Sequence, residues 1–178
     1  PEIEQLESKM VYENRWMRVR EDRIRRQSGA EGIYGIVEKA DFVVIIPVQG
    51  DCIHLVEQYR YPVKKRYWEL PQGAWEGNSE ASHLQVAVGE LREETGLTSG
   101  NMTYLGEQFL AYGFTSQVYH IYFATELKFS SNKLDAEEEG LITRSFSLSQ
   151  FEDMILSGVI KDATTVNAYG LAKLKGLI

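Results

Sequence analysis

The chain has 178 residues, of which 43% are hydrophobic and 25% charged, and its formal net charge is −7. The length predicts one globular domain with a small appended layer, and it disfavours two full domains. The composition excludes a disordered, collagen-like or coiled-coil chain. The acidic balance disfavours a nucleic acid or an anionic membrane as partner, so a phosphate-bearing ligand needs a local basic patch or a metal.

The single cysteine, Cys52, excludes an intrachain disulfide and suits a reducing compartment. No apolar run approaches the roughly 20 residues that span a membrane, and the N-terminus is too polar for a signal peptide. We therefore expect a cytoplasmic protein that makes no use of a membrane.

The first part of the chain is predicted to consist of strands. Residues 15–26 carry six arginines interleaved with apolar side chains, a pattern typical of an exposed pair of strands. β-branched and aromatic runs predict further strands at 34–38, 42–48, 53–60, 102–105, 119–127 and 142–146.

Helices are predicted in the second half. The first runs from about Ser82 to Thr95, because Gly96 can adopt the left-handed conformation that ends helices. Two more are predicted at 148–156 and 163–174, the last with Asp162 as its cap. Strands before helices, with little strict alternation, indicate an α+β fold in which helices sandwich a mixed β-sheet, with a small N-terminal antiparallel sheet.

The first predicted helix carries three carboxylates on one side. At about 100° per residue, Leu84, Val88 and Leu91 form the stripe expected to pack on the sheet, and the carboxylates lie well away from it. Like charges at this spacing repel by roughly 0.2–0.5 kcal/mol per pair. A cation such as Mg²⁺ or Mn²⁺, which suits all-oxygen ligands, would remove the repulsion; a plain solvated helix face is the alternative. The three carboxylates are those of Glu90, Glu93 and Glu94.

The run Glu-Leu-Pro-Gln-Gly at 69–73 is followed by Gly-Glu-Leu-Arg-Glu-Glu-Thr-Gly-Leu at 89–97. Together they resemble the signature of the Nudix hydrolases, Gly-x5-Glu-x7-Arg-Glu-U-x-Glu-Glu-x-Gly-U, in which U is a bulky aliphatic residue. The second run matches the second half of this signature at every position but one. The resemblance implies a Nudix fold and a bound divalent ion, Mg²⁺ or Mn²⁺. The implied ligands are Glu90, Glu93, Glu94 and the backbone carbonyl near Gln72, and Glu94 is implied as a catalytic residue as well.

The sequence departs from this signature in two ways. The stretch from Gly73 to Glu90 is longer than the signature, so the first signature glutamate has two candidate counterparts, Asn78 and Glu80. Gly89 replaces the signature arginine, so the ion pair that this arginine makes is absent or supplied from elsewhere. Both changes concern the support of the site and leave its metal-binding half intact.

The similarity extends across most of the chain and looks closest to the ADP-ribose pyrophosphatase subgroup. Residues 57–62 and 68–71 resemble the subgroup's basic strand and the turn that follows it, and 157–165 resembles its C-terminal helix entry. The resemblance implies that Arg60 contacts the diphosphate of the substrate; a surface ion pair is the alternative.

The resemblance also implies that a mobile acidic loop, at residues 135–139, supplies the catalytic base. We expect Glu137 in this role, with Glu139 second, and a solvated turn is the alternative. The water that attacks a negatively charged diphosphate must lose a proton, which requires a nearby carboxylate. Divalent ions would lower the pKa of that water, and a flexible loop would let the base close in after the substrate binds.

The loop at 111–117 departs from the subgroup, which often has a Ser-Pro-Gly loop that ends in Glu. Here the candidate substrate contact at the loop end is Gln117, whose neutral amide cannot replace a carboxylate. Phe114 and Tyr112 could stack on a base or a sugar, although aromatic residues more often lie in a core. The reaction class is unaffected, but the base and the sugar of the substrate stay open.

The N-terminal strands resemble the small sheet that members of the subgroup place across a homodimer interface. This divides the chain into a dimerisation layer, residues 1–38, and a Nudix domain, residues 39–178. The resemblance implies that Trp16 and Arg18, with Arg20, help to hold the nucleoside of the other subunit; a plain edge hairpin is the alternative. Arginine and tryptophan are favoured at interfaces.

The leading expectation is a Mg²⁺-dependent hydrolase that cleaves the diphosphate linkage of a nucleoside diphosphate derivative to a nucleoside monophosphate and a sugar phosphate. ADP-ribose is the first substrate expected, and a GDP- or UDP-sugar the second. A Nudix-fold module that binds a nucleotide sugar without turnover is the alternative, suggested by Gly89, the longer loop and Gln117. An RNA cap or polyphosphate hydrolase fits poorly with the net negative charge.

Overall fold

A computed structural model describes residues 1–74, 81–130 and 140–178. These residues form two compact units. The N-terminal unit consists of residues 1–41 with 108–119, and the main unit consists of the described residues of 42–107 and 120–178. Of the helices in the described part of the chain, none is long and apolar enough to cross a membrane.

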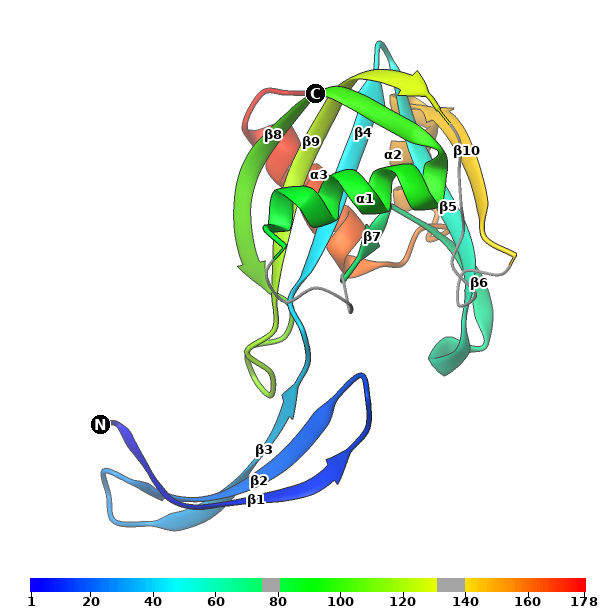
Figure 1. Cartoon of the computed structure of the whole chain (residues 1–178). Helices are drawn as coiled ribbons and strands as arrows, with labels where there is room; N and C mark the ends of the chain where they lie inside the picture. Colours follow the sequence, from blue (N-terminus) through cyan, green and yellow to red (C-terminus); the bar gives the residue numbers. More distant parts are fainter. Residues whose placement is uncertain (75–80, 131–139) are drawn as a thin grey trace. The chain divides into compact units, whose positions relative to one another are not determined.

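The N-terminal unit contains a three-stranded antiparallel sheet with β2 in the middle (Figure 1). Its strands are β1 (Ile3–Glu13), β2 (Arg18–Arg26) and β3 (Glu31–Glu38). The prediction of a pair of strands at 15–26 is wrong, because these residues form one strand and the turn before it. The side-chain oxygen of Asn14 makes this turn by accepting hydrogen bonds from the backbone N–H groups of Trp16 and Met17, both at 2.9 Å.

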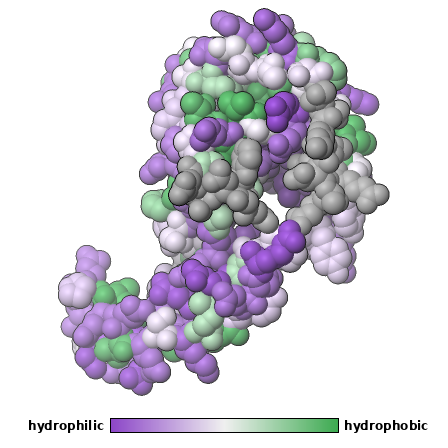
Figure 2. Space-filling model, viewed as in Figure 1, coloured by the Kyte–Doolittle hydropathy of each residue, from purple (hydrophilic) through white to green (hydrophobic). Residues whose placement is uncertain are grey.

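Little of this N-terminal sheet is buried. Of the described residues in its three strands, Asp22 and Ile24 are buried. Figure 2 shows hydrophobic residues at the surface of the sheet among polar ones. The exposed large apolar residues in and next to its strands are Ile3, Met10, Val11, Tyr12, Trp16, Ile33 and Tyr34. A sheet with so small a core can bury its apolar face only by packing against another layer.

The segment 108–119 packs on β3 within the N-terminal unit. The backbone N–H of Val37 donates to the carbonyl of Phe114 at 2.8 Å, and the hydroxyl of Tyr34 donates to the carbonyl of Gly113 at 3.0 Å. Thr115 forms an isolated parallel bridge with Val37. The loop at 111–117 is therefore held by backbone contacts to an N-terminal strand.

The main unit is built on a seven-stranded sheet with the order β10-β5-β4-β9-β8, in which β6 pairs with β5 and β7 pairs with β4. Figure 1 shows α1 in front of this sheet and α3 behind it. The strands are β4 (Phe42–Gln49), β5 (Cys52–Arg60), β6 (Lys65–Glu69), β7 (Gln72–Gly73), β8 (Leu97–Phe109), β9 (Val118–Phe129) and β10 (Ile142–Ser147), with a 3-10 turn, η1 (Tyr61–Val63), between β5 and β6. The predicted α+β class is confirmed.

The core of the main unit surrounds β4. Its residues Val43, Val44, Ile45 and Ile46 are each at most 1% exposed, as expected for a strand that is covered on both faces. Side chains alternate along a strand, so Val43 and Ile45 share one face. They form a core cluster with Leu91 of α1, and α3 also packs against β4.

The three helices begin and end close to their predicted positions. They are α1 (His83–Thr95), α2 (Leu148–Leu156) and α3 (Ala163–Leu174). Ser82 caps α1 and Ser147 caps α2, each in a reciprocal pair with a glutamine three residues later. Asp162 caps α3 as predicted. Gly96 has a φ of 72°, the left-handed conformation expected after the end of α1.

The predicted packing stripe of α1 is wrong in two of its three residues. Leu84 is 43% exposed and Val88 is 49% exposed, and of the three only Leu91 is buried. Glu94, which was expected to lie away from the packing face, is buried. Small residues on the buried side let α1 approach β4 and β7 closely, and this turns the larger Leu84 and Val88 outward. The buried residues of α1 are Val86, Ala87, Gly89, Leu91, Glu94 and Thr95.

Candidate active site

The turn at residues 69–73, which joins β6 to β7, carries the first half of the sequence signature. β7 pairs with β4 and packs next to α1. The backbone N–H of Gln72 donates to Oε2 of Glu94 at 3.0 Å. Glu94 is 2% exposed, so a buried carboxylate of α1 is fixed directly to the turn.

A second contact joins Gly73 to Glu90. A Cβ placed on Gly73 would lie 2.5 Å from Oε2 of Glu90, which is closer than two such atoms approach. The carboxylate can lie there only because residue 73 has no side chain. The two halves of the signature, far apart in the sequence, therefore meet at two points in space.

The donor set at this turn fits a hard divalent cation. The predicted ligands Glu90, Glu93, Glu94 and the carbonyl of Gln72 all offer oxygen, and oxygen ligands are those that Mg²⁺ and Mn²⁺ take. Within residues 1–74, 81–130 and 140–178, no group of three or more His, Cys, Asp or Glu side chains is arranged to hold a metal by itself. Mg²⁺ is usually bound through one or two carboxylates, several waters and substrate phosphates rather than in a closed protein cage.

Arg60 forms an ion pair with the buried Glu69. Nε of Arg60 donates to Oε2 of Glu69 at 3.2 Å and Nη2 donates to Oε1, while Nε2 of Gln58 donates to Oε1 at 2.9 Å. The side chain of Glu69 is 3% exposed and that of Arg60 is 41% exposed. Burial raises the pKa of Glu69, and the charge and hydrogen bonds of Arg60 oppose that rise. Arg60 does form an ion pair, although its partner is buried and the alternative considered was a surface ion pair, and 41% of the Arg60 side chain remains exposed.

Glu69 was not among the residues predicted for the site. A signal was available, because Glu69 interrupts an apolar run between Trp68 and Leu70. An acidic residue in such a run is a buried charge that needs a partner, and Arg60 is that partner.

Two predicted substrate residues, Trp16 and Arg18, lie in the N-terminal unit. Trp16 is exposed, and the guanidinium carbon of Arg15 lies 4.4 Å from the centre of its ring. Arg18 pairs with Glu38 of β3 at 3.2 Å. These side chains are therefore supported by neighbours of their own sheet.

The other two, Phe114 and Gln117, lie in the loop that packs on β3. Phe114 and the nearby Tyr112 are exposed, so their rings are accessible to a ligand. Gln117 is buried, and its side-chain Nε2 donates to the carbonyl of Ala40. This bond gives Gln117 a role in holding its own loop.

Four further candidates cannot be compared with the structure. Glu137 and Glu139, the first and second candidates for the base, lie outside the described residues, as do Asn78 and Glu80.

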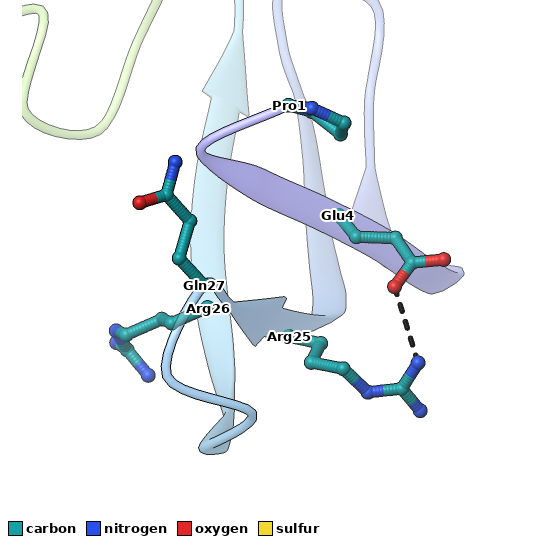
Figure 3. Close-up of a pocket in the computed structure, with 5 residues that line it drawn as sticks. All are labelled: Pro1, Glu4, Arg25, Arg26 and Gln27. Carbon is teal, nitrogen blue, oxygen red and sulfur yellow. Dashed lines mark hydrogen bonds and ion pairs between the residues drawn. The ribbon is translucent and has the colours of Figure 1, made fainter.

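The N-terminal unit contains a hollow of about 340 Å³, lined by Pro1, Glu4, Arg25, Arg26 and Gln27 (Figure 3). Arg25 donates to the carboxylates of Glu4 and Glu31, each at 3.1 Å. The hollow contains none of the residues that the sequence implicates in catalysis, and its arginine is already paired with two carboxylates. We assign it no part in the reaction.

Two family models match the chain. One, described as the nucleoside diphosphate sugar hydrolase N-terminal domain, matches residues 3–37. The other, described as the NUDIX domain, matches residues 38–168, which is more than half of the chain.

Known proteins resemble the chain over most of its length. An ADP-ribose pyrophosphatase from Mycobacterium tuberculosis (strain ATCC 25618 / H37Rv) is 28% identical over 167 residues, covering 93% of this chain and 80% of the relative. An ADP-ribose pyrophosphatase from Bacillus subtilis (strain 168) is 28% identical over 142 residues, covering 79% of this chain and 76% of the relative. A crystal structure of an ADP compounds hydrolase has a TM-score of 0.87 at 22% identity, covering 99% of this chain and 96% of the other. The structural match shows the fold.

Proposed function

Because the chain belongs to the Nudix hydrolase family, we propose that it is a Mg²⁺-dependent enzyme that cleaves the diphosphate linkage of ADP-ribose to AMP and ribose phosphate. The observation that supports this best is the meeting of Glu94 with the N–H of Gln72 and of Glu90 with Gly73. It brings Glu90 and Glu94 of α1 to the turn at 69–73, which carries the Gln72 carbonyl that is the further proposed ligand.

Glu90, Glu93, Glu94 and the carbonyl of Gln72 would hold the divalent ion. When bound, Mg²⁺ would neutralise charge on the phosphoryl oxygens and lower the pKa of the attacking water. The hydrogen bond from Gln72 keeps Glu94 directed at the turn, and Gly73 leaves room for Glu90. The carboxylate of Glu94 is then held in place before the substrate arrives, which lowers the cost of ordering it.

Glu137 is the proposed base, with Glu139 second. The base takes a proton from the water as the water oxygen attacks phosphorus, and the bridging P–O bond breaks with its electrons leaving on the departing phosphate. A carboxylate suits this step because it can accept a proton from the attacking water.

The substrate assignment draws on the relatives, two of which are named as ADP-ribose pyrophosphatases. Arg60 is proposed to contact the diphosphate, because 41% of its side chain is exposed beside its ion pair with Glu69. Phe114 is exposed and is proposed to stack on the base or the sugar, and Gln117 supports its loop. Because Gln117 stands where the subgroup often has a carboxylate, a GDP- or UDP-sugar is the second substrate proposed.

The sheet at residues 1–38 is proposed to join two subunits in a homodimer. Its strands expose more large apolar side chains than they bury, and such a surface favours association. Trp16 and Arg18 would then help to hold the nucleoside bound to the partner subunit. Arg18 is held in place by its ion pair with Glu38.

The test is a screen of ADP-ribose, GDP- and UDP-sugars and dinucleotides with Mg²⁺ or Mn²⁺. Wild type should release AMP from ADP-ribose, and Glu94→Gln should lose roughly 10²–10⁴-fold in rate, the range for an essential ionisable group. Glu107→Gln is the matched control, because this glutamate of β8 has a side chain that is 63% exposed, and it should keep the wild-type rate.

Each outcome of the screen decides one part of the proposal. Turnover of a GDP- or UDP-sugar in preference to ADP-ribose would replace the substrate and keep the reaction. A full rate in Glu137→Gln beside a large loss in Glu94→Gln would remove Glu137 as the base and keep the metal site. If no compound is turned over with either metal, the hydrolase proposal is overturned and the alternative of a module that binds a nucleotide sugar without hydrolysis is favoured.

A further inference from the structure

Asp162, the cap of α3, is hydrogen-bonded to the turn at 69–73. Its Oδ2 accepts from Nε2 of Gln72 at 3.3 Å, from the backbone N–H of Thr165 at 2.9 Å and from the Thr165 hydroxyl at 2.7 Å. One carboxylate oxygen thus connects the first turn of α3 to a residue 90 positions earlier in the chain.

Thr165 carries this connection on to Leu70. Its side chain is fully buried, and its Oγ1 accepts a hydrogen bond from the backbone N–H of Leu70 at 2.9 Å. A threonine hydroxyl has one proton to donate and two lone pairs that accept. Because Asp162 accepts the proton, a lone pair of Oγ1 faces Leu70, and the charge on Asp162 strengthens this orientation.

Gln72 is consequently held on two sides. Its backbone N–H is fixed by Glu94 at 3.0 Å and its side chain by Asp162. Two residues earlier, the N–H of Leu70 is fixed by Thr165. The peptide groups between these points have little freedom to rotate, and the carbonyl proposed as a metal ligand follows directly on the residue that is held on both sides.

We propose that Asp162 is a positioning residue for the hydrolysis, acting through Gln72 and Thr165 on the turn that faces Glu90 and Glu94. The effect on catalysis rests on the proposed function, whereas the hydrogen bonds of Asp162 and Thr165 do not depend on it. A misplacement of about 1 Å in a catalytic group can reduce the rate by about 100-fold.

Helix capping alone does not account for this arrangement. A cap requires only that Asp162 accept a hydrogen bond from the N–H of Thr165. It does not require Asp162 to accept from Gln72, nor the Thr165 hydroxyl to accept from Leu70. Ser147 provides the comparison, because it caps α2 by accepting from the N–H of Gln150 at 3.2 Å. Replacing Ser147 therefore measures how the loss of a helix cap alone affects stability.

The experiment compares Asp162→Ala and Thr165→Val with the wild type, with Thr165→Ser as the conservative variant and Ser147→Ala as the capping control. For each protein we measure kcat and KM separately, the Mg²⁺ concentration at half-maximal rate, and amide hydrogen exchange at Leu70 and Gln72. Asp162→Ala and Thr165→Val should lose about 10–100-fold in kcat or in apparent Mg²⁺ affinity, the range typical of partners that orient metal ligands. Exchange at Leu70 should accelerate in both.

The two controls should behave differently. Thr165→Ser keeps the hydroxyl and should restore kcat and the slow exchange at Leu70. Ser147→Ala should lower the Tm while leaving kcat, the Mg²⁺ midpoint and the exchange at Leu70 as in wild type. If Asp162→Ala lowers the Tm and nothing else, as Ser147→Ala does, Asp162 is only a cap and the inference is overturned.

Failure of the proposed function would be seen separately. A wild-type protein that turns over no substrate contradicts the hydrolase proposal, and the positioning role is then decided by hydrogen exchange together with calorimetric titration of Mg²⁺ alone. Unchanged exchange and unchanged Mg²⁺ affinity in Thr165→Val would overturn the role. Should Asp162→Ala fail to fold, Asp162→Asn, which keeps an oxygen acceptor but no charge, replaces it with the same readouts and a smaller expected loss.

Discussion

The carboxylate of Glu90 lies where a side chain on Gly73 would begin, since a Cβ there would be 2.5 Å from Oε2 of Glu90. The colliding atoms are the end of a flexible side chain, so Gly73→Ala should displace Glu90 and spare the backbone. We expect Gly73→Ala to lose at least about 10-fold in kcat/KM with little change in Tm. The measurements are Mg²⁺-dependent turnover and thermal unfolding.

Gly170→Ala is the control for this substitution. A Cβ on Gly170, in α3, would meet no atom within 4 Å, and alanine stabilises a helix interior by about 0.5–1 kcal/mol relative to glycine. This variant should keep full activity and gain stability. Unchanged turnover in Gly73→Ala would contradict the role given to Glu90.

Replacing Arg60 should separate its structural role from its proposed contact with the substrate. Arg60→Met leaves the buried carboxylate of Glu69 without its main partner, and we expect a loss of about 1–3 kcal/mol in the free energy of unfolding. Adding Glu69→Gln removes the stranded charge and should recover part of that loss. Urea unfolding of the two single variants and the double variant measures the coupling.

The KM of the same double variant tests the contact with the diphosphate. If Arg60 binds the substrate, KM stays raised when stability returns. A KM that returns to the wild-type value together with the stability would limit Arg60 to its ion pair.

Stability should depend on pH through His54 in β5. Burial lowers the pKa of His54 below its ordinary value of 6.5. The folded protein therefore favours the neutral imidazole, and the contribution is fully present above pH 6.5 and is lost as the pH falls from there through the lowered pKa. Urea midpoints at about pH 8 and about pH 5 should fall further on acidification in wild type than in His54→Gln. An equal fall in the two proteins would contradict this prediction.

The oligomeric state should respond to a charge on the N-terminal sheet. The chain has a mass of 20.3 kDa, and we expect sedimentation of the wild type as a dimer. Ile33 is 66% exposed on β3, and Ile33→Lys should shift the equilibrium to the monomer, because a charge in an apolar interface is costly to bury. Leu174→Lys changes an apolar residue of α3 that is also exposed and should leave the dimer intact. A wild type that sediments as a monomer at about micromolar concentration would refute the proposed interface.

Features that depend on neighbouring residues could be predicted from the sequence. Ser82, Asp162 and Gly96 mark helix ends by local rules, since a capping oxygen or a left-handed glycine acts within one turn. The apolar run at 42–48 likewise predicted the strand that forms β4. These signals need no knowledge of what lies across the fold.

Features that depend on residues far apart in the sequence could not be predicted from it. The spacing of the glutamates placed Glu90, Glu93 and Glu94 on one side of α1, but the burial of Glu94 follows from its hydrogen bond to Gln72, which is 22 positions away. The packing stripe failed for a related reason, because close contact with β7 favours small residues over large ones. The pairing of Glu69 with Arg60 depends on the register between β5 and β6, which no local pattern specifies.

The link from α3 to the turn at 69–73 also bears on the order in which the molecule is completed during translation. A ribosome makes Leu70 and Gln72 some 95 and 90 residues before it makes Thr165 and Asp162. A growing chain can therefore contain every glutamate of the signature while the amide of Leu70 still lacks its acceptor. The turn gains the hydrogen bonds at Leu70 and at the Gln72 side chain only when α3 has been synthesised and has docked. The last supports of the proposed reaction centre therefore come from a segment that is made long after it.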